Sequence, residues 1–197
     1  MPAQEAIGFY FDVGGVLIPD PLGQNAREIF RQFGERFGSV DPQRAYDAYT
    51  RLQPQLDLGT ARLADLCRAA GFDQAVFERE WLALHPVDQE VLAVIDELVA
   101  RRRPVGLATN FCRGLLELVL TSAPVLSRLS ICCSADIGVV KPSAEFFSRA
   151  SEIIHARETV FVDDRAANIA AAQKFGWTTV YAEGDWLGRF KDRYLGA

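Results

Sequence analysis

Residues 7–18, Ile-Gly-Phe-Tyr-Phe-Asp-Val-Gly-Gly-Val-Leu-Ile, decide how the rest of the chain is interpreted. Their first five residues form a short, mostly apolar run that a turn signal ends, which is typical of a buried β-strand. Asp12 therefore stands at the carboxyl end of this strand, with Gly14 and Gly15 just after it. In open α/β sheets, ligands bind just outside the carboxyl ends of the strands. Asp12 is thus a candidate for chemistry, while a simple turn-capping role remains open because Asp is common in turns.

Composition and charge exclude several classes of protein. The chain has 197 residues, of which 49% are hydrophobic, so one domain or one domain with a small insertion is expected. The net charge of −5 argues against a nucleic-acid binder, which usually carries a concentrated positive face. The four cysteines have no metal-ligand spacing, and neither a signal peptide nor a membrane-length apolar run is found. We therefore expect a cytoplasmic protein with no nucleic-acid or membrane partner.

The pattern of hydrophobic residues divides the chain into two parts. Residues 20–85 contain only helical periodicity and loops, and beyond residue 86 short apolar runs alternate with amphipathic helices. Such alternation is typical of an α/β fold, with a parallel, Rossmann-like sheet covered by helices on both faces. The predicted domains are therefore an α/β core of residues 1–19 and 86–197 and an inserted helical domain of residues 20–85. Further strands are expected over 104–108, 129–133, 159–162 and 178–181.

Helix signals inside the insertion predict four helices. Apolar spacing and a terminal Gly38 suggest a helix over 24–37, and Asp41-Pro42 is a start signal for one over about 43–53. Thr60 is the expected N-cap of a third helix that Gly71 ends. The fourth is expected from Asp73 to Leu84, and a weakly helical tail over 183–195.

Polar residues recur wherever a predicted strand ends: Asp12, Thr109-Asn110 and Asp163-Asp164, with Lys141 in a loop before a helix. On a parallel sheet these ends meet at one edge. Carboxylates gathered in one place need a cation, and oxygen ligands suit Mg²⁺, which also binds substrate phosphate. The hydroxyl, amide and ammonium groups are suited to phosphate oxygens, and a carboxylate there can serve as a nucleophile that forms an aspartyl-phosphate.

Each of these pieces taken alone has a plainer interpretation. Thr109-Asn110 fits a simple turn, and Lys141 fits a solvated loop cation. Asp163-Asp164 fits a helix N-cap with an acid in the first turn. Their joint occurrence at strand ends favours the chemical interpretation.

The same stretches resemble the haloacid dehalogenase superfamily, in the branch with a helical cap inserted after the first motif (the C1 cap). The matching segments are Phe11–Leu17, Leu107–Asn110, Gly138–Pro142 and Phe161–Asp164, followed by Asn168 and Gly176. Their order and spacing fit, and the resemblance covers essentially the whole chain. It implies a hydrolase, a phosphatase of small phosphorylated metabolites that uses Mg²⁺, with residues 20–85 as the cap that closes over the substrate.

The resemblance also implies roles for individual residues. Asp12 would be the nucleophile and a metal ligand, and Lys141 would steady it and neutralise charge. Thr109, Asn110 and Gly15 would hold the phosphoryl group. The remaining implied metal ligands are Asp164, the main-chain carbonyl of Gly14, and Asp163 as a second ligand or an outer-shell partner.

Gly14 departs from the pattern of the family's phosphatases. These usually carry a second aspartate two residues after the nucleophile, which acts as general acid and base, and this chain has glycine there. Family members similar to sugar-1-phosphate phosphatases share an Asp-x-Gly pattern, so the resemblance implies that activity can persist without this aspartate, with a sugar-1-phosphate as a candidate substrate.

Two other functions remain open at this point. A non-catalytic, regulatory protein that binds phosphate would also lack the proton-transfer group at Gly14. A metal-free haloacid dehalogenase lacks that aspartate too, but adjacent Asp163-Asp164 beside a nucleophilic carboxylate would be costly without a cation. A phospho-receiver domain uses similar residues, but it carries its acid pair near the start of the chain. Here the pair, Asp163-Asp164, comes late in the sequence, so this function is rejected.

Overall fold

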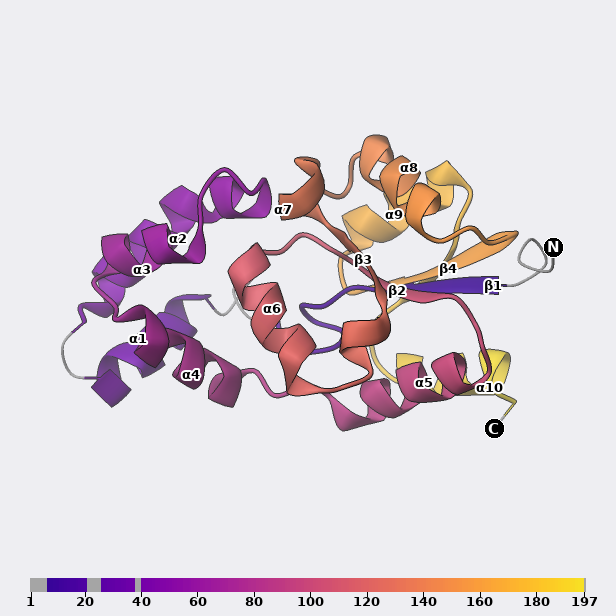
Figure 1. The fold of residues 1–197 in the computed structure, drawn as a ribbon, viewed down its shortest axis with the longest axis horizontal. Helices are drawn as coiled ribbons and strands as arrows, with labels where there is room; N and C mark the ends of the chain where they lie inside the picture. The colour runs from indigo at the N-terminus through magenta and orange to yellow at the C-terminus, as the bar shows by residue number, and fades with distance from the viewer. Residues whose placement is uncertain (1–6, 21–25, 38–39, 197) are drawn as a thin grey trace.

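The computed structural model describes residues 7–20, 26–37 and 40–196, and its centre is a five-stranded sheet (Figure 1). All four pairings in it are parallel, and the strand order is β3-β2-β1-β4-β5. The expected strands are confirmed within a residue or two: β1 Ile7–Phe11, β2 Val105–Thr109, β3 Ser130–Cys133, β4 Glu158–Asp163 and β5 Thr178–Tyr181. The first strand of the chain thus lies at the centre of the sheet, with its carboxyl end between those of β2 and β4.

Helices cover both faces of the sheet, as alternation of strand and helix predicts. In Figure 1, α8 (Ala144–Ile153) and α9 (Ala166–Phe175) lie on one side, and α5 (Gln89–Ala100) and α10 (Trp186–Tyr194) on the other. Successive side chains of a strand point to opposite faces. Phe9 of β1 accordingly packs edge-on against Phe190 of α10, and Tyr10 stacks on Trp177 beyond α9.

In the insertion of residues 20–85, the regular elements of the described part are all helices. It contains α1 (Ala26–Phe37), α2 (Pro42–Asp57), α3 (Leu63–Ala70) and α4 (Gln74–Leu84), which form the left-hand lobe of Figure 1. Phe30, Phe33 and Phe77 are fully buried inside this lobe. Residues 24, 25 and 38, at the expected ends of the first helix, lie outside the described residues. We call the lobe formed by α1–α4 the cap.

Two helix boundaries in the cap differ from the sequence-based expectation. Helix α2 continues through Pro54 to Asp57, and buried Leu56 fixes its last turn. The main-chain N–H of Thr60 bonds to the carbonyl of Gln55, so Thr60 closes α2 instead of starting α3. Helix α3 begins at Leu63, where the Asp65 carboxylate accepts from the main-chain N–H of Arg62.

The remaining helices are α6 (Arg113–Ser122), the short α7 (Ser134–Ile137) and a single 3₁₀ turn at Leu126–Arg128. The last two are too short to show a periodicity in the sequence, and neither was expected. The weak helical pattern of the tail forms α10, because Phe190 is buried under the sheet. No helix among the described residues is both long and apolar enough to span a membrane.

Candidate active site

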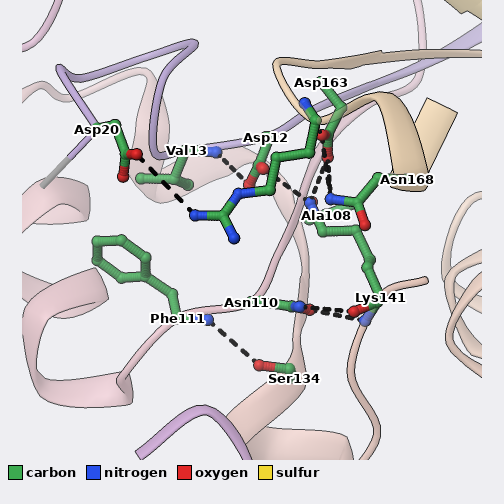
Figure 2. Close-up of polar contacts among 11 residues, drawn as sticks. Asp12, Val13, Asp20, Ala108, Asn110, Phe111, Ser134, Lys141, Asp163 and Asn168 are labelled. Atoms are coloured by element: carbon green, nitrogen blue, oxygen red, sulfur yellow. Dashed lines mark hydrogen bonds and ion pairs between the residues drawn. The ribbon is translucent and has the colours of Figure 1, made fainter. Parts of the chain in front are cut away.

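The polar residues that follow the strands meet at the carboxyl edge of the sheet (Figure 2). Asp12 follows β1, Thr109 and Asp163 end β2 and β4, and Lys141 reaches them from the loop before α8. The Nζ of Lys141 lies 2.8 Å from Oδ2 of Asp12 and 2.6 Å from Oδ2 of Asp163. The other Asp12 oxygen accepts a 2.7 Å hydrogen bond from the main-chain N–H of Val13. The structure therefore brings together the residues that the sequence placed at strand ends.

Lys141 is buried, and its ammonium group is surrounded by oxygen atoms. Its Nζ also donates to the carbonyl of Ala108 at 2.9 Å. Burial lowers the pKa of Lys141, but the carboxylates of Asp12 and Asp163 outweigh burial and raise the pKa above its usual value. The side chain thus stays charged and offsets part of the carboxylate repulsion.

Asp163 is held from several sides. Both of its carboxylate oxygens accept from Nδ2 of Asn168 at 3.0 Å, and Oδ1 also accepts from the main-chain N–H of Arg165 at 2.8 Å. Burial, followed by repulsion from Asp12, raises the pKa of Asp163. Because its oxygens already have partners, Asp163 is placed to orient Lys141 and Asn168.

Asp164 differs from its neighbour, because its Oδ1 is buried without a hydrogen-bond partner among the described residues. The turn after β1 makes room for it: Gly15 has φ +74°, and a Cβ at this position would lie 2.2 Å from Oδ2 of Asp164. Carboxylate oxygens of Asp12, Asp163 and Asp164 lie within 4.8 Å of one another. An all-oxygen donor set with one unpartnered buried oxygen fits Mg²⁺.

Thr109 and Asn110 play different structural parts, although they are adjacent. The hydroxyl of Thr109 is buried and has no partner within the described residues, which is unusual for a buried polar group. The side-chain amide of Asn110 pairs with the main chain of Lys141, accepting from its N–H at 2.8 Å and donating to its carbonyl at 2.9 Å. Asn110 thus fixes the Lys141 loop, while the Thr109 hydroxyl makes no hydrogen bond with the described residues.

A cavity of about 220 Å³ lies over this edge of the sheet, between the core and the cap. From the core it is lined by Asp12, Gly14, Lys141 and Asn168, among others, and by apolar Phe111 and Leu115 near the start of α6. From the cap it is lined by Tyr49, Gln53, Leu56 and Asp57, which lie on one face of α2. A third wall holds Asp20 and Arg165, whose charged groups lie 4.0 Å apart.

Sequence reasoning found the strand-end residues of this cavity but missed those that close it. Asn168 was noted as part of a motif, and its bond to Asp163 was not foreseen. Arg165 directly follows the acidic pair, so its position was a usable signal. Asp57 and the other α2 residues carry no such signal, because nothing in a helix pattern tells which face of a cap meets the core.

Comparisons with known proteins agree with this geometry. The family model described as a haloacid dehalogenase-like hydrolase matches residues 8–176. A curated relative, a phosphoglycolate phosphatase of Yersinia pseudotuberculosis, is 33% identical over 90 residues, which are 44% of this chain and 39% of the relative. The aligned part thus spans well under half the length of that relative.

Solved structures share the fold at low sequence identity. A haloacid dehalogenase family enzyme of Bacteroides thetaiotaomicron, in complex with magnesium and inorganic phosphate, has a TM-score of 0.71 at 21% identity, covering 95% of this chain and 100% of the other. An L-2-haloacid dehalogenase of Xanthobacter autotrophicus with covalently bound chloropropionic acid has a TM-score of 0.60 at 13% identity, covering 98% and 85%. The family match over most of the length and the acidic strand-end cluster agree: the chain belongs to the haloacid dehalogenase-like hydrolases.

Proposed function

We propose that this protein is a Mg²⁺-dependent phosphatase of small phosphorylated metabolites that works through an aspartyl-phosphate on Asp12. The observation that carries the proposal is a pair of buried, unpartnered oxygens at the carboxyl ends of the two strands that flank β1: Thr109 Oγ1 at the end of β2 and Asp164 Oδ1 directly after β4. Burying a polar atom without a partner costs stability. Trp81 Nε1 and Tyr194 Oη are also buried without a partner among the described residues, but they lie in helices, whereas Thr109 and Asp164 lie at the carboxyl ends of strands, where α/β folds bind ligands. The Thr109 hydroxyl suits a phosphate oxygen, and the Asp164 carboxylate suits a cation.

The proposed roles follow from the contacts of each residue. Asp12 is the nucleophile, because its carboxylate lines the cavity and Lys141 holds it in place. The Thr109 hydroxyl and the Gly15 turn are assigned to the phosphoryl group, and Lys141 balances its charge. Asn110 lines the cavity and is assigned to the same group, although its side-chain amide is paired with the main chain of Lys141.

The metal ligands in this proposal are Asp12, Asp164 and the main-chain carbonyl of Gly14, with Asp163 behind them. Asp163 is assigned to the outer shell because Asn168, Lys141 and the main chain of Arg165 already occupy its oxygens. When bound, Mg²⁺ would neutralise the carboxylates and polarise the phosphoryl oxygens.

The reaction proceeds in two displacements at phosphorus. The Asp12 carboxylate attacks the phosphorus atom and forms a new P–O bond, while the bond to the leaving oxygen breaks and its electron pair stays with that oxygen. Water then attacks the same phosphorus atom, the bond to Asp12 breaks, and inorganic phosphate and free carboxylate result. The leaving oxygen must gain a proton in the first step, and the attacking water must lose one in the second.

The size of the substrate is limited by the cap. A cavity of about 220 Å³ suits a small metabolite and leaves no room for a folded phosphoprotein. The name of the Yersinia relative supports a small phosphorylated acid as the class of substrate. Sugar-1-phosphates are candidates within this class, because an anomeric leaving oxygen depends less on a proton donor and position 14 holds no carboxylate to act as one.

The alternatives make different use of the same residues. A haloacid dehalogenase is supported by the likeness to the Xanthobacter fold, but three carboxylates within 4.8 Å of one another speak for a metal-binding site. A non-catalytic phosphate binder is supported only by Gly14.

A single panel of assays separates these functions. Release of phosphate from aryl and metabolite phosphates is measured with Mg²⁺ and with EDTA, and halide release from 2-haloacids is measured in parallel. The proposal expects turnover of phosphate esters that EDTA abolishes and Mg²⁺ restores. Three outcomes would each refute the proposal: phosphate release at the same rate with and without EDTA, halide release alone, and phosphate binding without turnover.

A further inference from the structure

The cap wall of the cavity contains a carboxyl group that no contact explains. Asp57 is the last residue of α2, and its side chain lines the cavity together with Asp12 and Gly14. Its carboxyl group has no hydrogen bond or ion pair among the described residues, unlike Asp20, which faces Arg165. An unpaired, half-buried carboxylate costs stability, so its position calls for a reason.

The end of α2 is docked tightly on the core, which fixes where Asp57 stands. Gly59 has φ +71°, and a Cβ there would lie 2.1 Å from the carbonyl oxygen of Ala135 in α7. Only glycine permits this approach of the two backbones. The contact holds the carboxyl-terminal turn of the cap helix over the edge of the sheet from which Asp12 projects.

The surroundings of Asp57 favour its protonated form. It lies at the carboxyl end of a helix, where the helix dipole disfavours negative charge. Burial raises its pKa to about 6, Arg165 opposes this, and Asp12 adds to it. Tyr49 on α2 and Cys112 before α6 also interact electrostatically with Asp57. Burial raises the pKa of both side chains, so they are uncharged near neutrality. Asp57 is thus a carboxyl group that can both give and take a proton near pH 6.

We propose that Asp57, supplied by the cap, is the general acid and base of this phosphatase, in the place of the carboxylate that Gly14 lacks. The inference rests on the proposed function. In the first step the Asp57 carboxyl gives its proton to the leaving oxygen as the bond from phosphorus to that oxygen breaks. In the second step the resulting Asp57 carboxylate takes a proton from the water that attacks the aspartyl-phosphate, which restores the acid.

Other groups in the cavity fit this role less well. Lys141 is tied to two carboxylates, and Arg165 does not release its proton in the physiological range. Asp20 is balanced by Arg165. Among the described lining residues, Asp57 alone combines a free carboxyl group with a pKa near neutrality.

The test compares leaving groups in the Asp57→Asn variant. The value of kcat/KM is measured with Mg²⁺ for substituted aryl phosphates and for alkyl phosphates. General acid catalysis is worth about a hundred- to ten-thousandfold, so alkyl phosphates should lose a factor in this range and the most acidic phenols far less. Asp47→Asn, on an exposed turn of the same helix, is the matched control and should leave every rate unchanged. Asp20→Asn removes a charge from the same cavity and should shift all substrates alike.

Two further readouts separate a proton-transfer role from a structural one. Formate should restore alkyl-phosphate turnover to Asp57→Ala, because a small acid can occupy the space of the lost carboxyl group. A ¹³C NMR titration of the Asp57 carboxyl group, assigned with Asp57→Asn, should show a midpoint near pH 6 without any turnover.

The outcomes distinguish this inference from the function beneath it. A uniform loss for all leaving groups in Asp57→Asn, no rescue by formate, or a carboxyl group that titrates with an ordinary Asp midpoint would overturn the role of Asp57 and leave the phosphatase intact. A wild-type protein that hydrolyses no phosphate ester would refute both.

Discussion

The core wall of the cavity and its cap wall hold their polar side chains in different ways. On the core wall, Lys141 and Asp163 are each fixed by several hydrogen bonds and ion pairs. On the cap wall, Asp57 has no such partner among the described residues. Groups that hold one another are preorganised for chemistry that is the same for every substrate. A free group on a lobe that covers the site suits contacts made only when substrate is bound.

The difference predicts that substitutions in the core wall harm function or stability severely, and that those in the cap wall act selectively. The largest effect is expected for Asp12→Asn, which removes the proposed nucleophile. Turnover of an aryl phosphate should fall at least about a thousandfold, the scale seen when a nucleophile is lost. The exposed Asp47→Asn serves as control for the change of charge. Retention of most of the activity by Asp12→Asn would end the proposed mechanism.

Lys141→Met should be the most damaging change for stability. It leaves Asp12 and Asp163 buried beside each other without their cation, and breaking such a pair costs about 3 kcal/mol. The free energy of unfolding is measured in urea without magnesium, with Lys174→Met on exposed helix surface as control. An equal, small loss in both variants would show that the core wall is not held together as described.

Thr109→Val should separate function from stability. Valine has the same shape and removes a buried hydroxyl that lacks a partner, so the folded state should be as stable as the wild type or more so. Affinity for inorganic phosphate in the presence of Mg²⁺, measured by calorimetry, should weaken by about tenfold, because one hydrogen bond to a charged ligand is lost. Thr159→Val is the control for loss of a buried hydroxyl, because Thr159 lies at the amino end of β4, away from the carboxyl edge of the sheet that holds the site. Unchanged phosphate affinity would remove Thr109 from the binding site.

Asp57→Asn should change stability by less than Lys141→Met, and in the opposite direction. The pKa of Asp57 is raised from 3.8 to about 6 on folding, so the folded state binds the proton more tightly than the unfolded state. Wild-type stability therefore falls as pH rises from about 4 to about 6, and the penalty is constant above that. The variant should be more stable by about 1 kcal/mol at pH 7.5, a value reduced for partial solvent exposure.

The pH dependence gives this last prediction its control. Urea denaturation of both proteins from pH 4.5 to 7.5 should show an advantage of the variant that grows up to about pH 6 and is level above that. An advantage that does not change with pH would mean that the Asp57 carboxyl group is not perturbed.

The sheet and the core wall could be predicted from the sequence because two simple patterns govern them: short apolar runs for the strands, and apolar residues at helical spacing for the helices between them. Strands buried on both faces read as short apolar runs, and a parallel sheet brings whatever follows them to one edge. Asp12, Thr109 and Asp163 are therefore close in space because each follows or ends a strand. The expected end of the second cap helix, at about residue 53, was wrong: α2 continues through Pro54 to Asp57, where Leu56 is buried.

The cap wall could not be predicted in this way. Which face of α2 meets the core depends on packing between two lobes, and on a backbone contact such as that of Gly59 with Ala135. Neither leaves a periodic signal. The unexpected α7, which receives this contact, has only four residues and was invisible for the same reason.

The central claim is that the phosphoryl group of the substrate is transferred to the carboxylate of Asp12. Trapping this aspartyl-phosphate tests the claim most directly. The wild-type protein is mixed with Mg²⁺ and an excess of an aryl phosphate, quenched in acid within one turnover, digested, and analysed by mass spectrometry. The account predicts a phosphoryl group on the carboxyl of Asp12 in the peptide that contains residues 7–18, absent from Asp12→Asn and lost on treatment with hydroxylamine. Turnover of the ester without a phosphoryl group on Asp12, or with one on another residue, would contradict it.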